Sequence, residues 1–277
     1  MPKPIVTEFA SIARSASINT RSKNDSIRYQ NKKFQEAKFT VPTFIDLFDS
    51  SVQNSKSVTK RDGSTLCHMT SGTFAKVGTI IKLDMKDKGT SKKNLSHTPF
   101  LDVGAGLCSG LVAMHIQHRC NCVGLEQDEL TFEGSELLQD HVMKKLELDK
   151  KPFIPIHGDA YNLKGFGGAR IVYMWIKGVA PDLEDYLINV FINDKHAMYL
   201  VTHVPARLNK ELETLRLVKS FIGSFAKSSS KMQMHIYAKK ELNMSNDHIK
   251  KVNGEGLSDK IANAFFEHKT FSGNHKK

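Results

Sequence analysis

The chain has 277 residues, and its 40 Lys and Arg against 29 Asp and Glu give a formal net charge of +11. That length fits one domain of ordinary size with flanking arms. No apolar run is long enough for a membrane span and the four cysteines lack framework spacing, which predicts an intracellular protein, nuclear or otherwise cytoplasmic, with no membrane partner.

Positive charge is concentrated at the two flanks. Residues 1–60 carry ten Lys and Arg against five Asp and Glu, and residues 204–277 carry fourteen against seven, whereas the stretch between them is close to neutral. Basic flanks predict non-specific contact with nucleic acid or nucleoprotein, and a solvated surface is an equal alternative. We expect a partly disordered basic N-terminal arm over 1–60, a central domain over 61–240 and a basic C-terminal extension over 241–277.

The first predicted element is a helix over 74–85, where apolar residues recur at nearly helical spacing. A polar loop follows, and then an apolar strand over 99–103. Residues 109–118 predict a helix and residues 121–125 a second strand. This order of strand, turn, helix and strand is typical of the crossover unit of a parallel sheet.

The same alternation continues along the chain. We expect helices over 132–148, 182–192 and 258–267, strands over 153–157, 171–175, 197–203 and 232–238, and a mainly helical stretch over 208–226. Strands that alternate with helices imply a largely parallel sheet, which binds ligands at the carboxyl ends of its strands. The expected fold class is α/β, with a doubly wound, seven-stranded, mostly parallel sheet.

The turn between the first two strands carries the clearest site signal. Asp102 stands near the end of the first strand, and Gly104, Gly106 and Gly110 follow. Glycines at a strand-to-helix turn tolerate positive φ and let a ligand lie against bare backbone. The second strand closes on Glu126, 22 positions after Gly104, where a carboxylate can accept hydrogen bonds from both ribose hydroxyls. This layout predicts a crevice that binds a nucleoside.

Two departures from the dinucleotide fingerprint narrow the identity of the nucleoside ligand. That fingerprint needs glycine at its sixth position, where this chain has Ser109. An acidic residue two places before the first glycine, Asp102, also suits a cationic ligand better than a diphosphate. S-adenosylmethionine carries a ribose, an adenine, an ammonium group and a sulfonium, and we expect it as the cofactor in preference to a dinucleotide.

Four segments resemble, in order, the motifs of class I S-adenosylmethionine-dependent methyltransferases. They are residues 101–106, 123–126, 157–160 and 171–175. The resemblance implies a Rossmann-like methyltransferase fold with an antiparallel last strand, and it makes 61–240 the catalytic domain. It also implies that the cofactor contacts Asp102, Gly104, Ala105, Gly106, Gly110, Glu126, Gln127, Asp159 and Ala160. In this family the acidic residue of the third motif meets the adenine amino group, although His-Gly-Asp also fits an ordinary turn.

The stretch after the fourth motif resembles the Dot1-like histone lysine methyltransferases. Residues 178–184 contain an apolar turn, a proline and acidic residues before a helix that ends in Phe191. Residues 65–72 stand where that family has a loop over the cofactor, which adds Thr70 and Ser71 to the expected cofactor site. This resemblance implies a protein lysine as the acceptor, on a histone or a similar protein.

The end of the fourth motif departs from the Dot1-like pattern. That family has a polar Asn near the transferred methyl group, whereas this chain has Trp175. A tryptophan would wall a narrow apolar channel, which strips a lysine ammonium of water and lowers its pKa from about 10.4 towards the neutral form. We take Trp175 and Tyr173 as the catalytic candidates; a different acceptor or a lost activity are the alternatives that this departure leaves open.

Signatures of several other acceptors are absent from the sequence. There is no Pro-Cys pair for cytosine C5 methylation, no Asp/Asn-Pro-Pro-aromatic motif for base amino groups, and no glutamate pair for a guanidinium after the fourth strand. Two alternatives to lysine stay open: a nucleic-acid methyltransferase with the same core, which the charge favours, and a non-catalytic cofactor-binding module. The oligomeric state also stays open.

Histidines and cysteines at two other places allow a functional and a structural interpretation. His115, His118, Cys120 and Cys122 are metal-ligand types, but they straddle a helix end and a strand start, so we expect no metal site. His203 closes the fifth expected strand, where a histidine satisfied by its neighbours is at least as good an explanation as a base.

Overall fold

The computed structural model describes residues 69–90, 94–175, 181–203, 214–224, 231–242 and 244–273. All of them belong to one compact unit that spans residues 37–277. The arm expected over 1–60 lies outside the described residues, and so does the first half of the loop expected over 65–72.

The helices, in chain order, are α3 (Ser71–Asp87), α4 (Ser109–His118), α5 (Glu129–Leu146), the 3₁₀ helix η1 (Ala160–Asn162), α6 (Pro181–Asn193) and α7 (Leu257–Gly273). The strands are β1 (Pro99–Val103), β2 (Asn121–Glu126), β3 (Ile154–His157), β4 (Ile171–Met174), β5 (Tyr199–Thr202), β6 (Leu215–Ser224) and β7 (Lys231–Lys239). The elements expected before residue 204 and the strand over 232–238 are confirmed to within a few residues.

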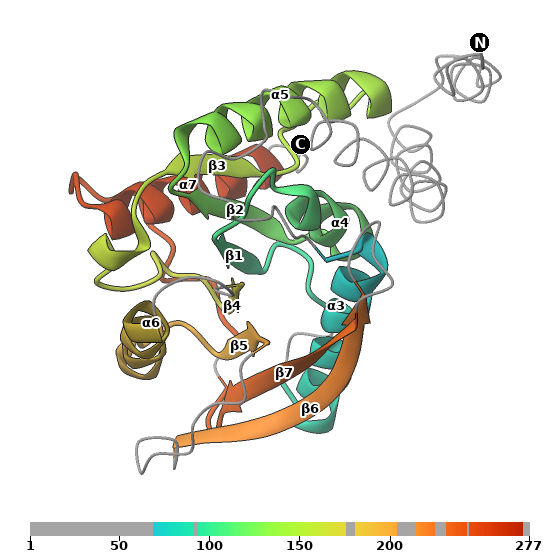
Figure 1. The fold of residues 1–277 in the computed structure, drawn as a ribbon, viewed down its shortest axis with the longest axis vertical. Coiled ribbons are helices and arrows are strands. Elements are labelled where there is room, and N and C mark those ends of the chain that lie inside the picture. The colour runs from blue at the N-terminus through green and yellow to red at the C-terminus, as the bar shows by residue number, and fades with distance from the viewer. Residues whose placement is uncertain are drawn as a thin grey trace, which may run out of the picture. The chain divides into compact units, whose positions relative to one another are not determined.

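The seven strands form one sheet in the order β3-β2-β1-β4-β5-β7-β6 (Figure 1). Strands β1 to β5 pair in parallel, and β7 lies antiparallel to both β5 and β6. The predicted doubly wound, mostly parallel sheet is therefore confirmed, as is the antiparallel direction of β7. We call the edge where β1 to β5 end the carboxyl edge, and the opposite one the amino edge.

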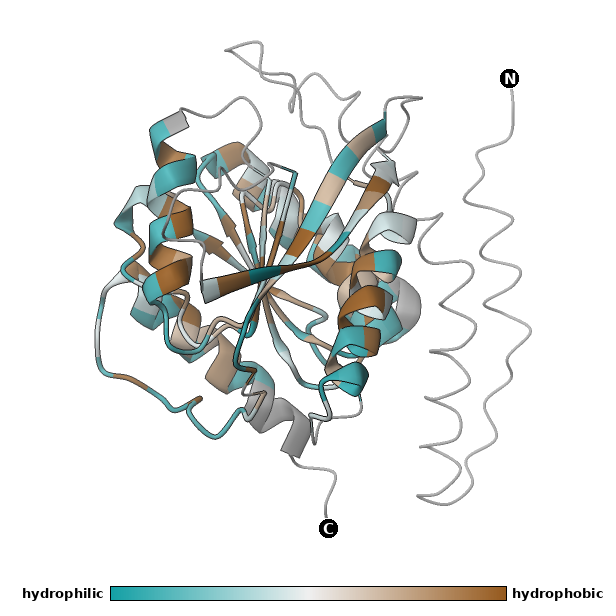
Figure 2. Cartoon of the chain, turned by 90° about the horizontal axis from the view of Figure 1, so that it is seen from below, coloured by the Kyte–Doolittle hydropathy of each residue, from teal (hydrophilic) through white to brown (hydrophobic). Residues whose placement is uncertain are grey.

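Helices α3, α4 and α5 cover one face of the sheet, and α6 and α7 cover the other (Figure 1). Because alternate strand residues point to opposite faces, Leu101 and Val103 join an apolar cluster with α6 and α7, while Phe100 packs towards α3. Figure 2 shows the corresponding bands of hydrophobic and hydrophilic residues along the helices. Within the described ranges, no helix is long and apolar enough to cross a bilayer.

The C-terminal helix α7 fills a gap in the winding of the sheet. The connection from β3 to β4 contains only η1, so it supplies no long helix over this part of the sheet. Ile261 and Phe265 of α7, both fully buried, instead join the apolar cluster that covers β2 and β3. The segment 241–277 thus contributes a core helix as well as basic residues, and the helix expected over 258–267 is confirmed.

The mainly helical stretch expected over 208–226 is wrong where the structure describes it. Its described part is the strand β6, which pairs along its length with β7. The apolar residues of this stretch also have helical spacing, but pairing with β7 buries Leu215 and Phe221 and leaves Leu217 and Ile222 exposed. Long-range strand pairing has overridden the local periodicity.

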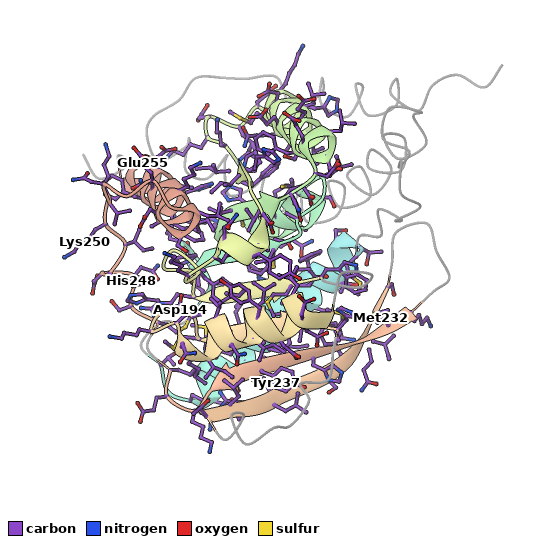
Figure 3. All side chains as sticks on the ribbon, turned by 60° about the vertical axis from the view of Figure 1, so that its left-hand side comes forward. Asp194, Met232, Tyr237, His248, Lys250 and Glu255 are labelled. Carbon is purple, nitrogen blue, oxygen red and sulfur yellow. The ribbon has the colours of Figure 1, made fainter. Side chains whose placement is uncertain are left out.

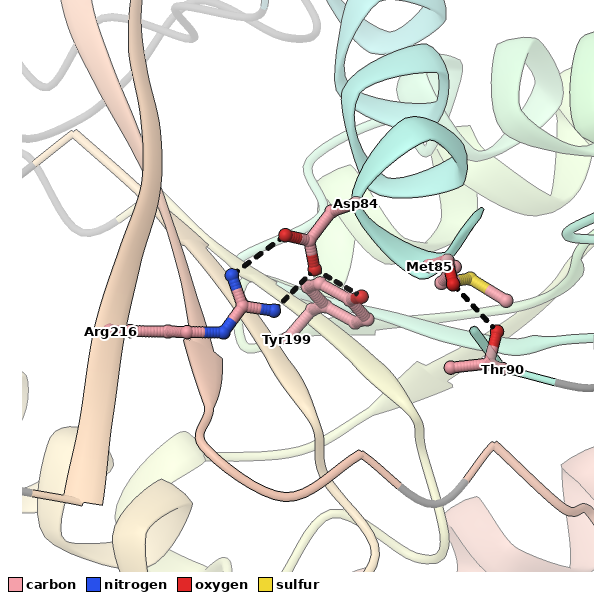
Figure 4. Close-up of polar contacts among 5 residues, drawn as sticks. All are labelled: Asp84, Met85, Thr90, Tyr199 and Arg216. Carbon is pink, nitrogen blue, oxygen red and sulfur yellow. Dashed lines mark hydrogen bonds and ion pairs between the residues drawn. The ribbon is translucent and has the colours of Figure 1, made fainter. Parts of the chain in front are cut away.

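At the amino edge an acidic side chain ties α3 to the last strands (Figure 4). The two oxygens of Asp84 accept hydrogen bonds from Arg216 of β6 at 2.7 and 2.5 Å, and the Tyr199 hydroxyl of β5 donates a third at 2.7 Å. Burial opposes ionisation of Asp84, but the bonds from Arg216 and Tyr199 outweigh it, so its pKa lies below the ordinary value. Nearby, the Thr90 hydroxyl donates to the Met85 carbonyl at 3.1 Å.

A buried cation, Arg170, lies directly before β4. Its guanidinium donates to the carbonyl of His196 at 2.7 Å, to the carbonyl of Ser245, and to Nδ1 of His248 at 3.0 Å. Because Arg170 can only donate, the Nε2–H of His248 is the side that donates to the Gly168 carbonyl, at 2.9 Å. These bonds attach the segment that leads to α7, on which Figure 3 labels His248, to the amino edge.

Candidate functional site

The turn after β1 has three residues in the left-handed region of backbone space. They are Gly104 at φ 77°, Gly106 at φ 55° and Cys108 at φ 61°. The amides of Gly104 and Ala105 both donate to the Leu125 carbonyl at 2.9 Å, which fastens the turn to the end of β2. The first two predicted glycines therefore lie at the carboxyl edge, where a ligand can approach bare backbone.

Cys108 occupies a turn position that the glycine pattern alone did not reveal. It takes the third left-handed position, which favours glycine, and immediately precedes α4. Its buried thiol lies against Gly124 of β2, where an added Cβ would stand 2.6 Å from the sulfur. The sequence carries no signal for this position, because a cysteine does not by itself indicate a left-handed backbone.

Gly110 has a packing role in the structure. It lies in the first turn of α4, and a Cβ there would stand 2.2 Å from the Phe74 ring of α3. Phe74 in turn packs against the rings of Phe100 and Tyr173, at centroid distances of 6.5 and 5.0 Å. Glycine therefore lets α3 and α4 approach closely, while a contact of Gly110 with the cofactor stays a prediction.

Glu126 ends β2 and holds the glycine turn from the other side. Its Oε2 accepts from the Gly106 amide at 2.8 Å, and its Oε1 accepts from the amides of Gln127 and Asp128 at 2.9 Å each. Each carboxylate oxygen has about two acceptor directions, so one remains at Oε2 for a ligand hydroxyl. The expectation that both ribose hydroxyls bond here stays a prediction, as does a direct role for Gln127.

Asp102 lies on the same rung of the sheet as Gly124 and Tyr173. Its side chain is 4% exposed, and its Oδ1 has no hydrogen-bond partner among the described residues. Burial, and then the negative charge of Glu126, raise the pKa of Asp102 well above its ordinary value. A buried carboxyl oxygen without a partner costs free energy, which a bound cationic group would recover.

The two catalytic candidates lie at different depths. Tyr173 is 3% exposed and packs on Phe74, and burial followed by the charge of Asp102 raises its pKa. Trp175 follows β4 directly and is half-buried, and its carbonyl oxygen would stand 3.2 Å from a Cβ on Gly104. Trp175 is therefore adjacent to the glycine turn, whereas Tyr173 belongs to the core beneath it.

Trp175 has an aromatic partner on the neighbouring strand. The ring centroids of Trp175 and His203 are 4.5 Å apart, and the rings are inclined by 38°. His203 follows β5 as Trp175 follows β4, and the two strands are in register at Met174 and Thr202. Sequence position singled out each residue separately, but their contact depends on the register of β4 and β5.

Asp159 and Ala160 follow β3 at the next strand end. Asp159 Oδ1 accepts from the Tyr161 amide at 3.0 Å and caps η1, which begins at Ala160. The Gly158 amide donates to the Glu126 carbonyl at 2.9 Å, so this loop is joined to the end of β2. Asp159 therefore has the ordinary turn role that its sequence context allowed, and its adenine contact stays a prediction.

Thr70 and Ser71 lie at the start of α3. The Thr70 hydroxyl accepts from the Thr73 amide at 3.2 Å and caps the helix, and the Thr70 amide donates to the Ser224 carbonyl at 2.9 Å. Ser224 ends β6, which runs in the same direction as β5, so this contact is at the carboxyl edge. Ser71 is buried beside it, and a cofactor contact of either residue stays a prediction.

In the part of the chain that the structure describes, no three His, Cys, Asp or Glu side chains are grouped so that they could hold a metal ion. His115 Nδ1 is bonded to the Cys120 carbonyl at 2.9 Å, and His118 Nε2 to the Ala75 carbonyl at 3.1 Å. These two histidines therefore serve the packing of α4.

No family model and no curated protein matches the chain. Among solved structures, the human methyltransferase 10 domain containing protein aligns with 72% of this chain and 97% of its own, at 12% identity and a TM-score of 0.47. Magnesium protoporphyrin IX methyltransferase from Synechocystis PCC 6803 aligns with 73% and 96%, at 11% identity and 0.45. An RNA methyltransferase from Salinibacter ruber aligns with 61% and 94%, at 12% identity and 0.39. At this level of likeness, the function depends on what the residues of this chain can do.

Proposed function

We propose that the chain is an S-adenosylmethionine-dependent methyltransferase. The observation that carries the proposal is the pair of carboxyls on β1 and β2, separated by the left-handed turn. Asp102 is buried with an oxygen that has no partner among the described residues, and Glu126 keeps one acceptor direction beside the turn. A ligand with a cationic amino-acid end and a ribose suits both groups at once.

The residues of the carboxyl edge fit S-adenosylmethionine in charge. Glu126 would hold the ribose, Asp102 and the turn at 104–106 the amino-acid end, and Asp159 the adenine amino group. When bound, the cofactor supplies an electrophilic methyl group on a sulfonium. The task of the chain itself is to position the acceptor and to keep water away from it.

A dinucleotide suits this edge less well, because the turn has few amides to offer a diphosphate. Phosphates at a helix start bind to backbone N–H groups. Here the amides of Gly104, Ala105, Gly106 and Cys108 all donate to acceptors within the chain. The carboxyls of Asp102 and Glu126 also disfavour a second negative charge.

We further propose a protein lysine as the acceptor, on a histone or a similar protein. The described rim beyond β3 and β4 is acidic: α6 has Asp182 and Glu184 in its first turn, and the Tyr161 hydroxyl is bonded to Asp182 close to Asp159. Acidic side chains attract a lysine ammonium and repel a phosphate backbone. The half-buried indole of Trp175 would exclude water from the acceptor amine, which favours its neutral, nucleophilic form.

A nucleic-acid acceptor is the second candidate, because the chain has a net charge of +11. The basic flanks suit either a nucleic acid or a nucleoprotein that carries the lysine. The net charge of the chain therefore bears on which partner it binds, whereas the acidic rim bears on which chemical group enters the site.

Calorimetric titration of the full chain separates the two cofactor classes. We expect binding heat with S-adenosylmethionine and none with NAD at the same concentrations. Binding of NAD without binding of S-adenosylmethionine would contradict the proposal.

Incubation with radiolabelled methyl donor identifies the acceptor class. Separate pools of histones, bulk protein, RNA and DNA are offered to the full chain, with Glu126→Ala as the matched low-affinity control. We expect label in protein, most of it in histones, and on lysine after hydrolysis. Label confined to RNA or DNA would replace the lysine proposal with the nucleic-acid one, and binding without transfer to any pool would indicate a non-catalytic module.

A further inference from the structure

The rings of Trp175 and His203 are in contact at the carboxyl edge, next to the glycine turn. Both residues follow directly on parallel strands, β4 and β5, and both keep part of their surface exposed. The Trp175 carbonyl is the atom that a Cβ on Gly104 would meet, at 3.2 Å. The backbone of Trp175 is thus close to the turn expected to hold the methyl donor, and the ring pair lies at the ends of β4 and β5.

Other titratable groups on the described neighbouring strands are less suited to meet an acceptor. Tyr173 of β4 and Asp102 of β1 are buried away from the surface that an acceptor would reach, and burial raises the pKa of both. His235, which pairs in register with Thr202, is 7% exposed and its Nδ1 is bonded to the Ser220 hydroxyl at 2.8 Å. His203 combines an imidazole with partial exposure at this edge.

We propose that His203 is the proton acceptor for the substrate amine and that Trp175 positions and supports it; this proposal rests on the proposed methyltransferase function. Imidazole is the side chain whose ordinary titration lies nearest to neutral pH. An aromatic face stabilises a cation placed over it, most strongly when the face is an indole. The imidazolium formed by proton uptake is therefore favoured by contact with Trp175.

The proposed step needs no reactant other than the lysine, the methyl donor and His203. A proton leaves the lysine ammonium and binds to the His203 imidazole, and the N–H electron pair stays on the amine as its lone pair. That lone pair forms the new N–CH₃ bond while the C–S electron pair stays on sulfur, so that the products are a methyl-lysine ammonium, neutral S-adenosylhomocysteine and an imidazolium. The imidazolium then returns its proton to water.

The first test is an NMR titration of His203 in the cofactor-free protein. Trp175→Leu removes the indole, so we expect the His203 midpoint to shift to lower pH than in the wild type. Trp175→Phe keeps an aromatic face and should shift it less. An unchanged midpoint in Trp175→Leu would overturn the role given to Trp175, and this readout does not depend on activity.

The second test is the rate of single-turnover methyl transfer as a function of pH. We expect His203→Gln to lose about 100-fold or more in rate near pH 7, which is the scale of general-base catalysis. The acid limb of its pH profile should also disappear. The matched control is His196→Gln, which changes the histidine just before β5, at the amino edge, where it stacks on His248 at 4.1 Å. This control should keep the wild-type rate and profile.

Calorimetric binding of S-adenosylmethionine distinguishes failure of the His203 role from failure of the methyltransferase function. Intact binding in His203→Gln together with a wild-type rate and acid limb would overturn the assignment of His203 alone. If the wild type itself neither binds the methyl donor nor transfers methyl groups, the proposed function fails, and the role of His203 fails with it.

Discussion

The two edges of the sheet differ in how their buried charges are balanced. At the amino edge the Asp84 carboxylate accepts three hydrogen bonds from Arg216 and Tyr199, and the Arg170 guanidinium donates to three acceptors. At the carboxyl edge the buried Asp102 has an oxygen without a partner among the described residues, and Cys108 holds a conformation that favours glycine. Charges at the first edge are balanced by the chain itself, whereas the second leaves one for a ligand to balance.

This difference is what we expect of a binding protein, in which one region supports the fold and another binds the ligand. A site needs supports that do not move. At the amino edge, polar contacts join α3 to β5 and β6, and others join the segment before α7 to Arg170. Strain and unbalanced charge tend to be found where a ligand later compensates for them.

The largest effect is expected from breaking the network at the amino edge. Asp84→Ala removes the common acceptor of Arg216 and Tyr199 and should lower the free energy of unfolding by about 2–4 kcal/mol, measured by urea denaturation. The control Asp87→Ala changes an exposed acid on the same helix and should cost less than about 0.5 kcal/mol. Equal losses in the two variants would show that the network adds no stability.

A smaller effect on binding is expected at the carboxyl edge. Glu126→Ala removes the proposed ribose acceptor and the bond to the Gly106 amide, and it should weaken S-adenosylmethionine binding by about 1.5–3 kcal/mol in calorimetry. Glu133→Ala, at an exposed position of α5, is the control and should bind as the wild type does. Unchanged affinity in a folded Glu126→Ala protein would place the ribose elsewhere.

The pH dependence of stability should reveal a buried histidine of α7. Burial, and then the neighbouring His115, lower the pKa of His268 to about 3, whereas an unfolded histidine titrates near pH 6.5. Below about pH 6.5 the unfolded chain takes up the proton first, so the free energy of unfolding should fall by about 1.4 kcal/mol per pH unit from this group. Denaturation of the wild type and of His268→Gln between pH 7 and 5 measures the difference in slope, and identical slopes would contradict it.

The smallest effect is expected from Cys108→Gly at the strained turn, and Cys108→Val is the contrasting variant. Cys108→Gly should change the free energy of unfolding by less than about 1 kcal/mol, because relief of the left-handed conformation offsets the loss of a buried thiol. Cys108→Val, with a β-branched side chain at the same positive φ, should lose more than about 2 kcal/mol. Similar losses in the two variants, measured by thermal unfolding, would show that backbone strain is unimportant at this position.

Much of this architecture could be predicted from the sequence because local signals agreed with the fold. The apolar run over 99–103, the turn glycines and the following helix all point to one crossover unit, and the structure has that unit at the same residues. The strand β6 could not be predicted in this way, because its identity depends on pairing with β7. The place of α7 over β2 and β3 also depends on distant contacts, since nothing in 257–273 shows which helix it substitutes.

The sequence predicted which single residues belong to the candidate site, but it could not predict which residues they contact. Asp102 and Glu126 stand out by their position at strand ends, but the unpartnered oxygen of Asp102 follows from burial in three dimensions. Likewise, Trp175 and His203 are 28 residues apart in the sequence and meet only through the register of β4 with β5.

If a cationic ligand balances Asp102, binding of S-adenosylmethionine should release a proton from the protein. Since burial raises the pKa of Asp102, its carboxyl holds a proton more readily in the free protein than an ordinary aspartate does, and a bound ammonium group should lower that pKa again. Calorimetry of the wild type in two buffers of different ionisation enthalpy should therefore show proton release and an affinity that rises with pH, both lost in Asp102→Asn. Binding with no proton release, or with equal release in Asp102→Asn, would contradict the account.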